Sequence, residues 1–407
     1  MKQLDAPVVV IGAGPAGLAA AKALADGGVG VLVVERDEAP GGLPRFCRHP
    51  GFGWAYTRRF ESGPAFARRM LAALDPARVA IETRTSVLSL EAGPTLHLLS
   101  AEHGNLHLRP RAVVLATGIR ERPRSARLVP GRRPERGVLT TGQLQQMVAR
   151  GVPVRGRRAI VVGTEHVSFS VLLTARHAGL KVVAMAGPED RVMSHAAAGL
   201  LARAAGIPIH LSTTVEDIEG SVHVEAVTLR GPDGTHRIAC DTVVFTGDFV
   251  PDCTLFRGDD VDPATGGPLV DQFGRTNLPG VFAAGNVLRA VETSGWAANE
   301  GARVGANAAA YLDAPAAWRE NAARIAAGPG VAYVVPQFHA PANGMAALPV
   351  SLRADRDMRP ARLHLDADGA EYWRGNLPSA RRLRRVAVEA DAFATLPAGR
   401  PAEFRFD

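Results

Sequence analysis

The sequence feature that most constrains the fold is a glycine-rich turn close to the start of the chain. An apolar stretch over residues 8–11 runs into the turn Gly-Ala-Gly-Pro-Ala-Gly at 12–17, and an alanine-rich segment follows as far as Ala25. A second apolar stretch over 31–34 ends in Glu35. Strand, glycine turn, helix, strand and terminal acid are the parts of a βαβ dinucleotide-binding unit. This order therefore predicts an α/β chain with a Rossmann-like, nucleotide-binding domain.

Each position of the turn has a physical role in such a unit. Gly12 allows the tight turn, Gly14 lets the backbone approach a pyrophosphate, and Gly17 lets the helix pack closely on the strand. Pro15 and Ala16 stand at the start of the helix, where the first N–H groups have no partner within the helix and can bind an anion. We expect all five residues to contact the nucleotide.

The acid that ends the second strand is expected to bind the sugar of the nucleotide. Glu35 stands where a carboxylate can accept hydrogen bonds from ribose hydroxyls, and Arg36 beside it is expected to border the same nucleotide. The acid alone does not separate FAD from NAD, so later residues have to decide which nucleotide binds.

Three later segments resemble the FAD-binding pattern of the two-dinucleotide-binding-domain flavoproteins. They are a Gly-Gly pair at 41–42, an Ala-Thr-Gly turn at 116–118 and the stretch Pro-Gly-Val-Phe-Ala-Ala-Gly-Asn at 279–286. By that resemblance the cofactor is FAD, held noncovalently. The further FAD-binding residues that the resemblance implies are Gly41, Gly42, Val87, Ala116, Thr117, Gly118, Gly285, Asn286 and Trp296.

Two of these positions carry specific expectations. The family places an aspartate at the end of the late strand, where it binds the ribityl chain, whereas this chain has Asn286, which can still donate and accept hydrogen bonds. A helix expected from Trp296 to Tyr311 would direct its N-terminus at the pyrimidine edge of the flavin, where the reduced ring carries negative charge.

Composition limits the classes of protein. The chain has 407 residues, 46% hydrophobic and 5% aromatic, which suits two or three domains around α/β cores. It contains no apolar run long enough to span a membrane and no signal-peptide pattern at its start, so we expect a cytoplasmic protein. The net charge is +7, and almost all of the basic residues are arginines. The arginine clusters lack interleaved aromatic residues. We therefore expect no nucleic-acid partner.

The cysteines argue against two kinds of redox centre. Cys47, Cys240 and Cys253 are the three in the sequence, and no two form a Cys-x-x-Cys pair. This spacing argues against a dithiol relay, and three thiols do not supply the four ligands of an iron–sulfur cluster. No other group of residues has metal-ligand spacing, so no metal site is predicted.

A loop with unusual composition follows the Gly-Gly pair. Cys47 and His49 lie within the segment 44–54, together with arginines and a tryptophan, and we expect a helix to follow from Trp54 to Met70. One interpretation makes these two residues catalytic, bordering the isoalloxazine ring and the substrate. The alternative is that Cys47 is a small buried hydrophobe and that His49 only stabilises the loop through a hydrogen bond.

Residues 158–187 repeat the opening pattern of strand, turn, helix and strand, but with losses at the positions that bind nucleotide. In an alignment on residues 9–35, Gly163 replaces Gly12, whereas the positions of Gly14, Gly17 and Glu35 are taken by Glu165, Ser168 and Ala186. A carboxylate would repel a pyrophosphate, and alanine offers nothing to a ribose. The fold should persist, but we expect no NAD(P) to bind there.

The segment 116–145 narrows the resemblance. Its Ala-Thr-Gly-x-Arg-Glu-Arg-Pro run and the later Gly-Val-x-Thr-x-Gly-x-x-Gln resemble the flavoprotein subunits of hydrogen cyanide synthase, opine oxidase and heterotetrameric sarcosine oxidase. The similarity is greater still to flavoproteins associated with glycerol-3-phosphate dehydrogenases, where the Cys47 loop and the segment 333–337 also have counterparts. The resemblance covers essentially the whole chain.

Together these observations predict two Rossmann-like domains, the second inserted in the first, and a small β-rich C-terminal domain. The expected boundaries are 1–145 and 247–312 for the FAD domain, 150–246 for the degenerate NAD(P)-like domain and 313–407 for the last. The expected function is an FAD-dependent dehydrogenase or oxidase, or its flavin subunit. It would oxidise a small amine, amino acid, opine or glycerol 3-phosphate and pass electrons to a non-NAD acceptor, such as a second subunit or an acceptor protein. An NAD(P)H-dependent reductase and a non-catalytic FAD subunit are the alternatives.

Overall fold

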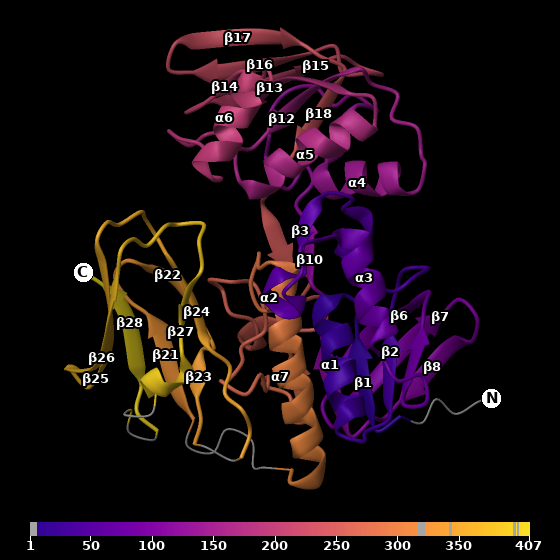
Figure 1. The fold of residues 1–407 in the computed structure, drawn as a ribbon, viewed down its shortest axis with the longest axis vertical. Helices are drawn as coiled ribbons and strands as arrows, with labels where there is room; N and C mark the ends of the chain where they lie inside the picture. Colours follow the sequence, from indigo (N-terminus) through magenta and orange to yellow (C-terminus); the bar gives the residue numbers. More distant parts are fainter. Residues whose placement is uncertain (1–5, 316–321, 342–343, 394–395, 397–398) are drawn as a thin grey trace.

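The computed structural model describes residues 6–315, 322–341, 344–393, 396 and 399–407, which form three regions (Figure 1). The first, which we call the FAD region, is built on a parallel sheet in the order β20-β9-β1-β2-β5. Its strands are β1 (Val8–Ile11), β2 (Val31–Val34), β5 (Val79–Glu82), β9 (Ala112–Leu115) and β20 (Val281–Ala283). Because β20 comes from the chain that follows the second region, the second region is inserted into the first, as the sequence predicts.

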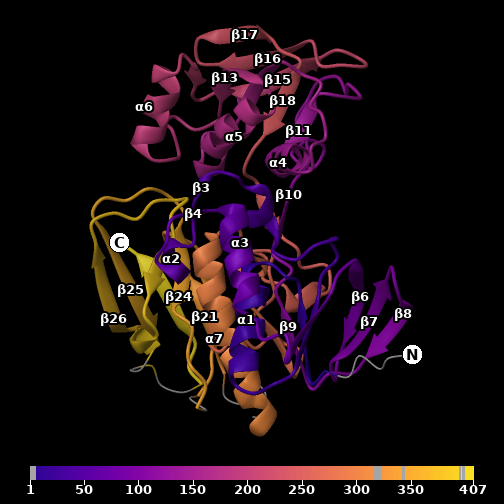
Figure 2. The ribbon, with the colours of Figure 1, turned by 45° about the vertical axis from the view of Figure 1, so that its right-hand side comes forward.

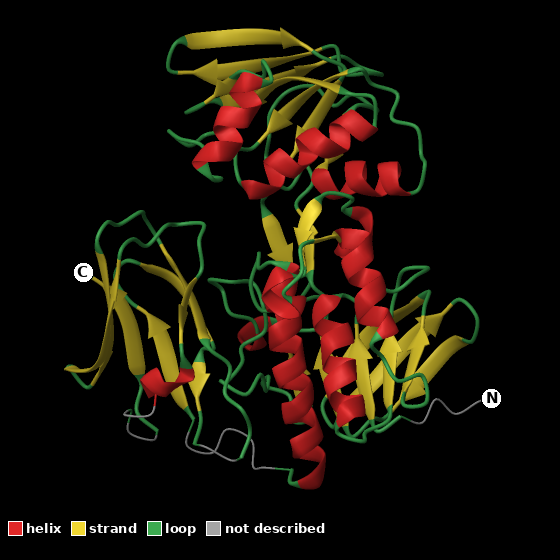
Figure 3. Ribbon diagram, viewed as in Figure 1, coloured by secondary structure: helices red, strands yellow, loops and turns green. Residues whose placement is uncertain are grey.

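Both faces of this sheet are covered, which explains why four of its strands are apolar throughout. Figure 3 shows helices on one face, namely α1 (Pro15–Asp26), α3 (Gly63–Ala72) and α7 (Ser294–Asp313). On the other face lies a β-meander, made of β6 (Thr85–Glu91), β7 (Thr95–Ser100) and β8 (Gly104–Leu108). Successive residues of β1 point to opposite faces, so Val8 and Val10 join the helical core and Val9 and Ile11 join the core beneath the meander.

The second region, which we call the inserted region, has the same architecture on a smaller scale. Its parallel sheet has the order β11-β18-β12-β13-β14, and an antiparallel sheet β15-β16-β17 packs beside it. The strands are β11 (Val138–Thr140), β12 (Arg158–Val162), β13 (Lys181–Ala186), β14 (Ile209–His210), β15 (Thr214–Glu219), β16 (Ala226–Gly231), β17 (Gly234–Ala239) and β18 (Thr242–Phe245). The helices are α4 (Thr141–Ala149), α5 (His166–His177) and α6 (Ala196–Ala204).

Two short strands connect the FAD and inserted regions. They are β10 (Ile119–Glu121) and β19 (Phe249–Pro251), which pair antiparallel. The chain leaves the FAD region through β10 and returns through β19, so the covalent connection between the two regions is this narrow ribbon (Figure 1).

The C-terminal region is rich in β-strands, as predicted. It contains the sheets β23-β21-β28-β25-β26 and β22-β24-β27, whose inner residues form one core. Its strands are β21 (Ala323–Ala327), β22 (Val331–Val335), β23 (Phe338–His339), β24 (Val350–Ala354), β25 (Ala361–Ala367), β26 (Ala370–Leu377), β27 (Val386–Val388) and β28 (Ala402–Phe406). Figure 2 shows this region beside α7, with its upper loops near α6 of the inserted region.

The segment after β2 differs from the expected helix between Trp54 and Met70. The structure instead has η1 (Leu43–Phe46), β3 (Pro50–Phe52), α2 (Trp54–Thr57) and β4 (Glu61–Ser62) before α3 begins. Helix α2 ends because Arg58 takes a left-handed conformation with φ 57°, which a helix cannot continue. The remaining short turns are η2 (Gly258–Asp260), η3 (Gly285–Val287) and η4 (Ala390–Phe393). Within the described residues no helix is long and apolar enough to cross a membrane.

Candidate active site

The glycine turn between β1 and α1 has the geometry that the sequence predicts. Gly12 has a φ of 104°, and a Cβ there would lie 2.5 Å from the Ala116 carbonyl oxygen. A Cβ at Gly17 would lie 1.8 Å from the Gly12 carbonyl oxygen, so the helix can approach the strand only with glycine at this position. A Cβ at Gly14 would meet only the Gly42 Cα, at 4.0 Å. Open space therefore remains in front of the α1 N-terminus, where a pyrophosphate would lie.

The carboxylate of Glu35 is buried at the end of β2 and lies against this turn. Its Oε2 accepts the Ala13 N–H at 2.9 Å and its Oε1 accepts the Asp37 N–H at 2.9 Å. Each carboxylate oxygen can accept a further hydrogen bond, so the group can still receive ribose hydroxyls. The Arg36 guanidinium pairs with Asp252 at 2.9 Å, and its contact with the nucleotide stays a prediction.

The other predicted FAD residues surround the same opening. Gly41 donates its N–H to the Ala13 carbonyl, and a Cβ at Gly42 would lie 2.8 Å from the Gly14 Cα, so this pair lies directly over the turn. On the other side the Thr117 hydroxyl donates to the Asp252 carbonyl at 2.7 Å. The remaining two residues of that turn, Ala116 and Gly118, follow β9, and Val87 lies half-buried in β6.

The late strand and α7 complete the opening, although their polar groups are already paired within the protein. The Gly285 N–H donates to Glu300 at 2.8 Å. The Asn286 side chain accepts the Glu292 N–H at 2.7 Å and donates to the Glu292 carbonyl at 3.1 Å. Its amide thus makes two hydrogen bonds with the backbone of Glu292, and its contact with a ribityl chain stays a prediction. Trp296 lies in the first turn of α7, which begins two residues earlier than predicted.

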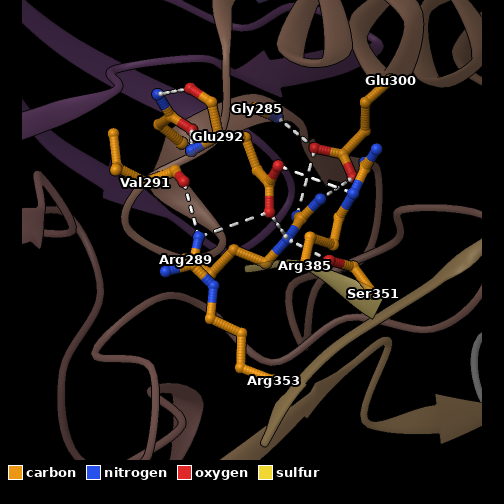
Figure 4. A network of polar contacts seen from close by, with 9 residues as sticks. Gly285, Arg289, Val291, Glu292, Glu300, Ser351, Arg353 and Arg385 are labelled. Atoms are coloured by element: carbon orange, nitrogen blue, oxygen red, sulfur yellow. Dashed lines mark hydrogen bonds and ion pairs between the residues drawn. The ribbon is translucent and has the colours of Figure 1, made fainter. Parts of the chain in front are cut away.

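A buried ion-pair network beneath this strand was not found from the sequence (Figure 4). Arg289 contacts Glu300 at 2.9 Å and Glu292 at 3.8 Å, and Arg353 and Arg385 also reach Glu292. Burial alone would lower the pKa of Arg289, but the two carboxylates raise it above its ordinary value. The network joins the FAD region to the C-terminal region, and no local pattern links residues so far apart in the chain.

Cys47 and His49 both lie within hydrogen-bonding distance of neighbouring protein groups. The Cys47 thiol lies 3.4 Å from Gln145 Oε1 and 3.5 Å from the Leu43 carbonyl oxygen, as a hydrogen-bond donor does. Burial, and to a smaller degree Glu121, raise the pKa of Cys47 to about 12. His49 has its Nδ1 3.0 Å from the Pro50 carbonyl oxygen. Both arrangements match the structural alternative for these residues, and the catalytic role stays a prediction.

We expect the Cys47 thiol to resist alkylation. With a pKa of about 12, only about one thiol in 10,000 is ionised at pH 8, and the thiolate is the reactive form. Iodoacetamide at pH 8, followed by peptide mass spectrometry, should modify Cys47 in urea but not in the folded protein. Equal labelling of Cys47 with and without urea would contradict this expectation.

Burial also raises the pKa of Cys240 to about 11 and of Cys253 to about 12. The thiols therefore ionise at lower pH in the unfolded chain than in the folded protein, so the free energy of unfolding should fall as the pH rises above 9.

Glu121 is a further buried acid that sequence reasoning missed. Its Oε2 accepts the Gly142 N–H at 2.6 Å, while its Oε1 is buried and has no hydrogen-bond partner among the described residues. Burial raises the pKa of Glu121, against the lowering effect of hydrogen bonds from Thr140, Gly142 and Thr141. The residue lies near Cys47, whose pKa its charge raises, at the border of the FAD and inserted regions.

The glycine loop of the inserted region, residues 163–168, is filled by its own side chains. Glu165 caps α5, and its Oε2 accepts the Thr164 N–H at 3.1 Å. The same oxygen lies 2.7 Å from where a Cβ of Gly163 would stand, and Oε1 lies 2.7 Å from where a Cβ of Gly247 would stand. The Ser194 N–H donates to the Thr164 carbonyl, so the following loop also lies against this turn. The aligned opening of the FAD region has none of these contacts.

Comparison with known proteins identifies the family. Residues 6–301 match the family model described as pyridine nucleotide-disulphide oxidoreductase. The chain belongs to this family. Its members that resemble the chain bind FAD, so the chain is an FAD-dependent oxidoreductase, and the opening around Gly14 and Glu35 fits that cofactor.

The relatives share most of the FAD and inserted regions. A thioredoxin reductase of Treponema pallidum is 27% identical, over 76% of this chain and 98% of its own. A putative glutamate synthase [NADPH] small chain of Cereibacter sphaeroides is 28% identical over 76% of this chain and 78% of its own. An opine oxidase subunit of Rhizobium meliloti is 26% identical over 61% of this chain and 58% of its own.

A solved structure supports the fold. The thioredoxin reductase of T. acidophilum has a TM-score of 0.63 and 19% identity, and the match covers 77% of this chain and 99% of that one. The family match ends at residue 301, so the C-terminal region lies beyond it.

Proposed function

We propose that the chain is a flavin-dependent dehydrogenase, or the flavin-carrying subunit of one, that is reduced by a small substrate rather than by NAD(P)H. The substrate classes are those of the narrower resemblance: an amine, an amino acid, an opine or glycerol 3-phosphate. Bound FAD supplies the hydride-accepting chemistry, and the protein orients it and excludes water. Electrons then pass to a non-NAD acceptor, such as a second subunit, an acceptor protein or oxygen.

The filled glycine loop of the inserted region carries this proposal. A nucleotide pyrophosphate needs close approach to backbone N–H groups and an absence of negative charge. Glu165 places a carboxylate at that position and uses it to accept the Thr164 N–H. Ala186, which replaces the ribose-binding acid, is buried and offers no side-chain hydrogen bond. These features disfavour a bound NAD(P) through both repulsion and lost hydrogen bonds.

The thiols and one relative add support. The protein contains three cysteines, none of them part of a Cys-x-x-Cys pair, and all three have raised pKa values, first because of burial. A thiol relay in this chain would need an accessible thiolate and a second thiol nearby. The opine oxidase relative has a name that fits the proposed substrate classes.

An NAD(P)H-dependent reductase is the second candidate, and the comparisons favour it over the first. The relatives with the longest matches are thioredoxin reductases and a putative glutamate synthase small chain whose name includes NADPH. This candidate requires the loop at Glu165 to open far enough to admit a nucleotide, with Thr164 losing its present partner.

Anaerobic stopped-flow absorbance separates the two candidates. We expect that excess NADH or NADPH leaves the flavin band of the purified yellow protein unbleached over minutes. A panel of amines, amino acids, opines and glycerol 3-phosphate, tested with and without added acceptor proteins, should contain the reductant. Rapid bleaching by either nicotinamide would contradict the first candidate and support the second. Flavin that is reduced neither by NADH or NADPH nor by any molecule of the panel would contradict both candidates and favour a non-catalytic FAD subunit.

A further inference from the structure

Four basic side chains from the three regions lie together where these regions meet. They are His49 after η1, His166 at the start of α5, His195 before α6 and Arg384 before β27; we call this set the basic junction. The imidazole centroids of His166 and His195 are 5.5 Å apart and nearly perpendicular. Arg384 Nη2 lies 2.9 Å from His195 Nδ1. The C-terminal region thus contributes a side chain to a cluster that the other two regions form.

The other three basic groups act electrostatically on His166. The pKa of His166 is lowered, first by burial and then by the positive charges of His195, His49 and Arg384. Within the described residues no ion pair joins any of the four to a carboxylate. Glu165, the neighbour of His166, has its carboxylate directed at the Thr164 N–H instead. Converging basic groups without an acid are stabilised by a bound anion.

Ion pairs of neighbouring residues help to hold Arg384 in position. Arg382 Nη2 lies 3.2 Å from Glu189 Oε1 in the inserted region, and Arg191 of that region pairs with Asp357. The backbone N–H of Arg382 donates to Asp357 at 2.9 Å, which closes this contact. The chain just before Arg384 is therefore held against the inserted region, and the next residue, Arg385, pairs with Glu292 of the FAD region at 3.6 Å.

The hydrogen bond from Arg384 determines what His195 can offer a ligand. A guanidinium has donors only, so His195 Nδ1 must accept, and the neutral ring then carries its proton on Nε2. That N–H is a donor. The guanidinium would repel a metal cation at the same place, so the junction suits an anion and not a metal.

The junction also borders the candidate FAD site. His49 follows Cys47 in the loop whose Gly-Gly pair covers the α1 turn. Arg385, next to Arg384, has its guanidinium 3.7 Å from the ring centroid of Trp296 in the first turn of α7. A molecule held at the junction by one end would therefore lie alongside the elements that surround the flavin opening.

We propose that the basic junction binds the anionic group, a carboxylate or a phosphate, of the small substrate. This inference rests on the proposed function and names one part of its substrate. Both anions present the oxygen acceptors that a guanidinium and imidazole N–H donors bind. The C-terminal region then has a defined role, which is to supply Arg384 to the substrate site of a family fold that ends before it.

Isothermal titration calorimetry on the FAD-loaded full chain tests this. One arm titrates inorganic phosphate and the other succinate, each at constant ionic strength. We expect saturable binding of at least one anion, weakened about tenfold or more by Arg384→Gln and by His195→Gln, because a charge-assisted hydrogen bond contributes about 1.5–3 kcal/mol. The matched control is Arg356→Gln, at an exposed arginine of the same region that pairs with the adjacent Asp355; it should bind like the unmodified chain.

The outcomes separate the two anions and the two proposals. Binding of phosphate alone points to a phosphate ester, and binding of succinate alone to a carboxylate substrate. Folding of each variant is checked by its thermal melting temperature. If no anion binds, or if both junction variants bind as the control does, this inference is overturned while the proposed function stands. Tight binding of NADPH that bleaches the flavin would overturn the proposed function, and competition between NADPH and phosphate would assign the junction to that nucleotide instead of a small substrate.

Discussion

Replacing Gly14 with glutamate should abolish FAD binding while leaving the fold intact. This variant gives the first glycine loop the residue that the inserted region has at the aligned position, Glu165. The space in front of Gly14 is open, and its φ of −80° suits any residue, so the backbone does not oppose the change. The carboxylate would lie where the pyrophosphate binds, and opposing like charges costs several kcal/mol. We expect FAD affinity to fall about 100-fold or more, because each 1.4 kcal/mol is a factor of ten.

The measurement is the ratio of flavin to protein absorbance after purification, followed by titration with free FAD. Gly14→Ala should fold normally and bind FAD with an intermediate affinity, since its methyl group only narrows the opening. Ala72→Glu, at an exposed position of α3, adds the same charge to the same region and should stay yellow. A Gly14→Glu protein with normal flavin content would show that a carboxylate in this loop does not exclude a pyrophosphate. The same result would remove the main support for excluding NAD(P) from the inserted region.

The fold could be predicted from sequence because its determinants are local. Gly12, Gly17 and the apolar runs on either side specify a βαβ unit within thirty residues, and the damaged repeat around Gly163 specifies a second one. The β-rich end of the chain follows from equally local patterns. The prediction of one helix from Trp54 is wrong because Arg58 takes a left-handed conformation, which the presence of an arginine does not predict.

The sequence predicts the position of a site residue only where one continuous segment of the chain determines that position. Glu35 ends its own strand, so its place follows from the chain, and the structure puts it against the glycine turn. Asn286 was assigned to the ribityl chain by resemblance, but its amide is paired with the backbone of Glu292. The roles of Glu121 and Arg384 depend on contacts with other elements that are far away in the chain. Sequence spacing cannot reveal such contacts before the fold brings them together.

Arg289→Met should lower the free energy of unfolding by about 3–5 kcal/mol, since removing one partner of a buried ion pair leaves the other charge without compensation. Arg289 is 3% exposed, and Glu300 has it as its closest ion-pair partner at 2.9 Å. Glu292 keeps Arg353 and Arg385, so the cost falls mainly on Glu300. Urea unfolding, followed by tryptophan fluorescence at one fixed FAD concentration, measures the change. The FAD concentration must stay fixed because bound ligand adds to stability.

A second variant shows whether the unpaired charge is the cause. Arg289→Met combined with Glu300→Gln removes the stranded carboxylate, while the glutamine oxygen can still accept the Gly285 N–H that Glu300 accepts now. We expect the double variant to recover part of the lost stability, and Arg356→Met, at an exposed pair, to lose no more than about 1 kcal/mol. If the double variant is less stable than Arg289→Met, packing of the arginine side chain, and not its charge, holds the C-terminal region to the strand that ends at Gly285. In that case flavin affinity should change little, whereas a charge-based network predicts weaker FAD binding because Gly285 borders the flavin opening.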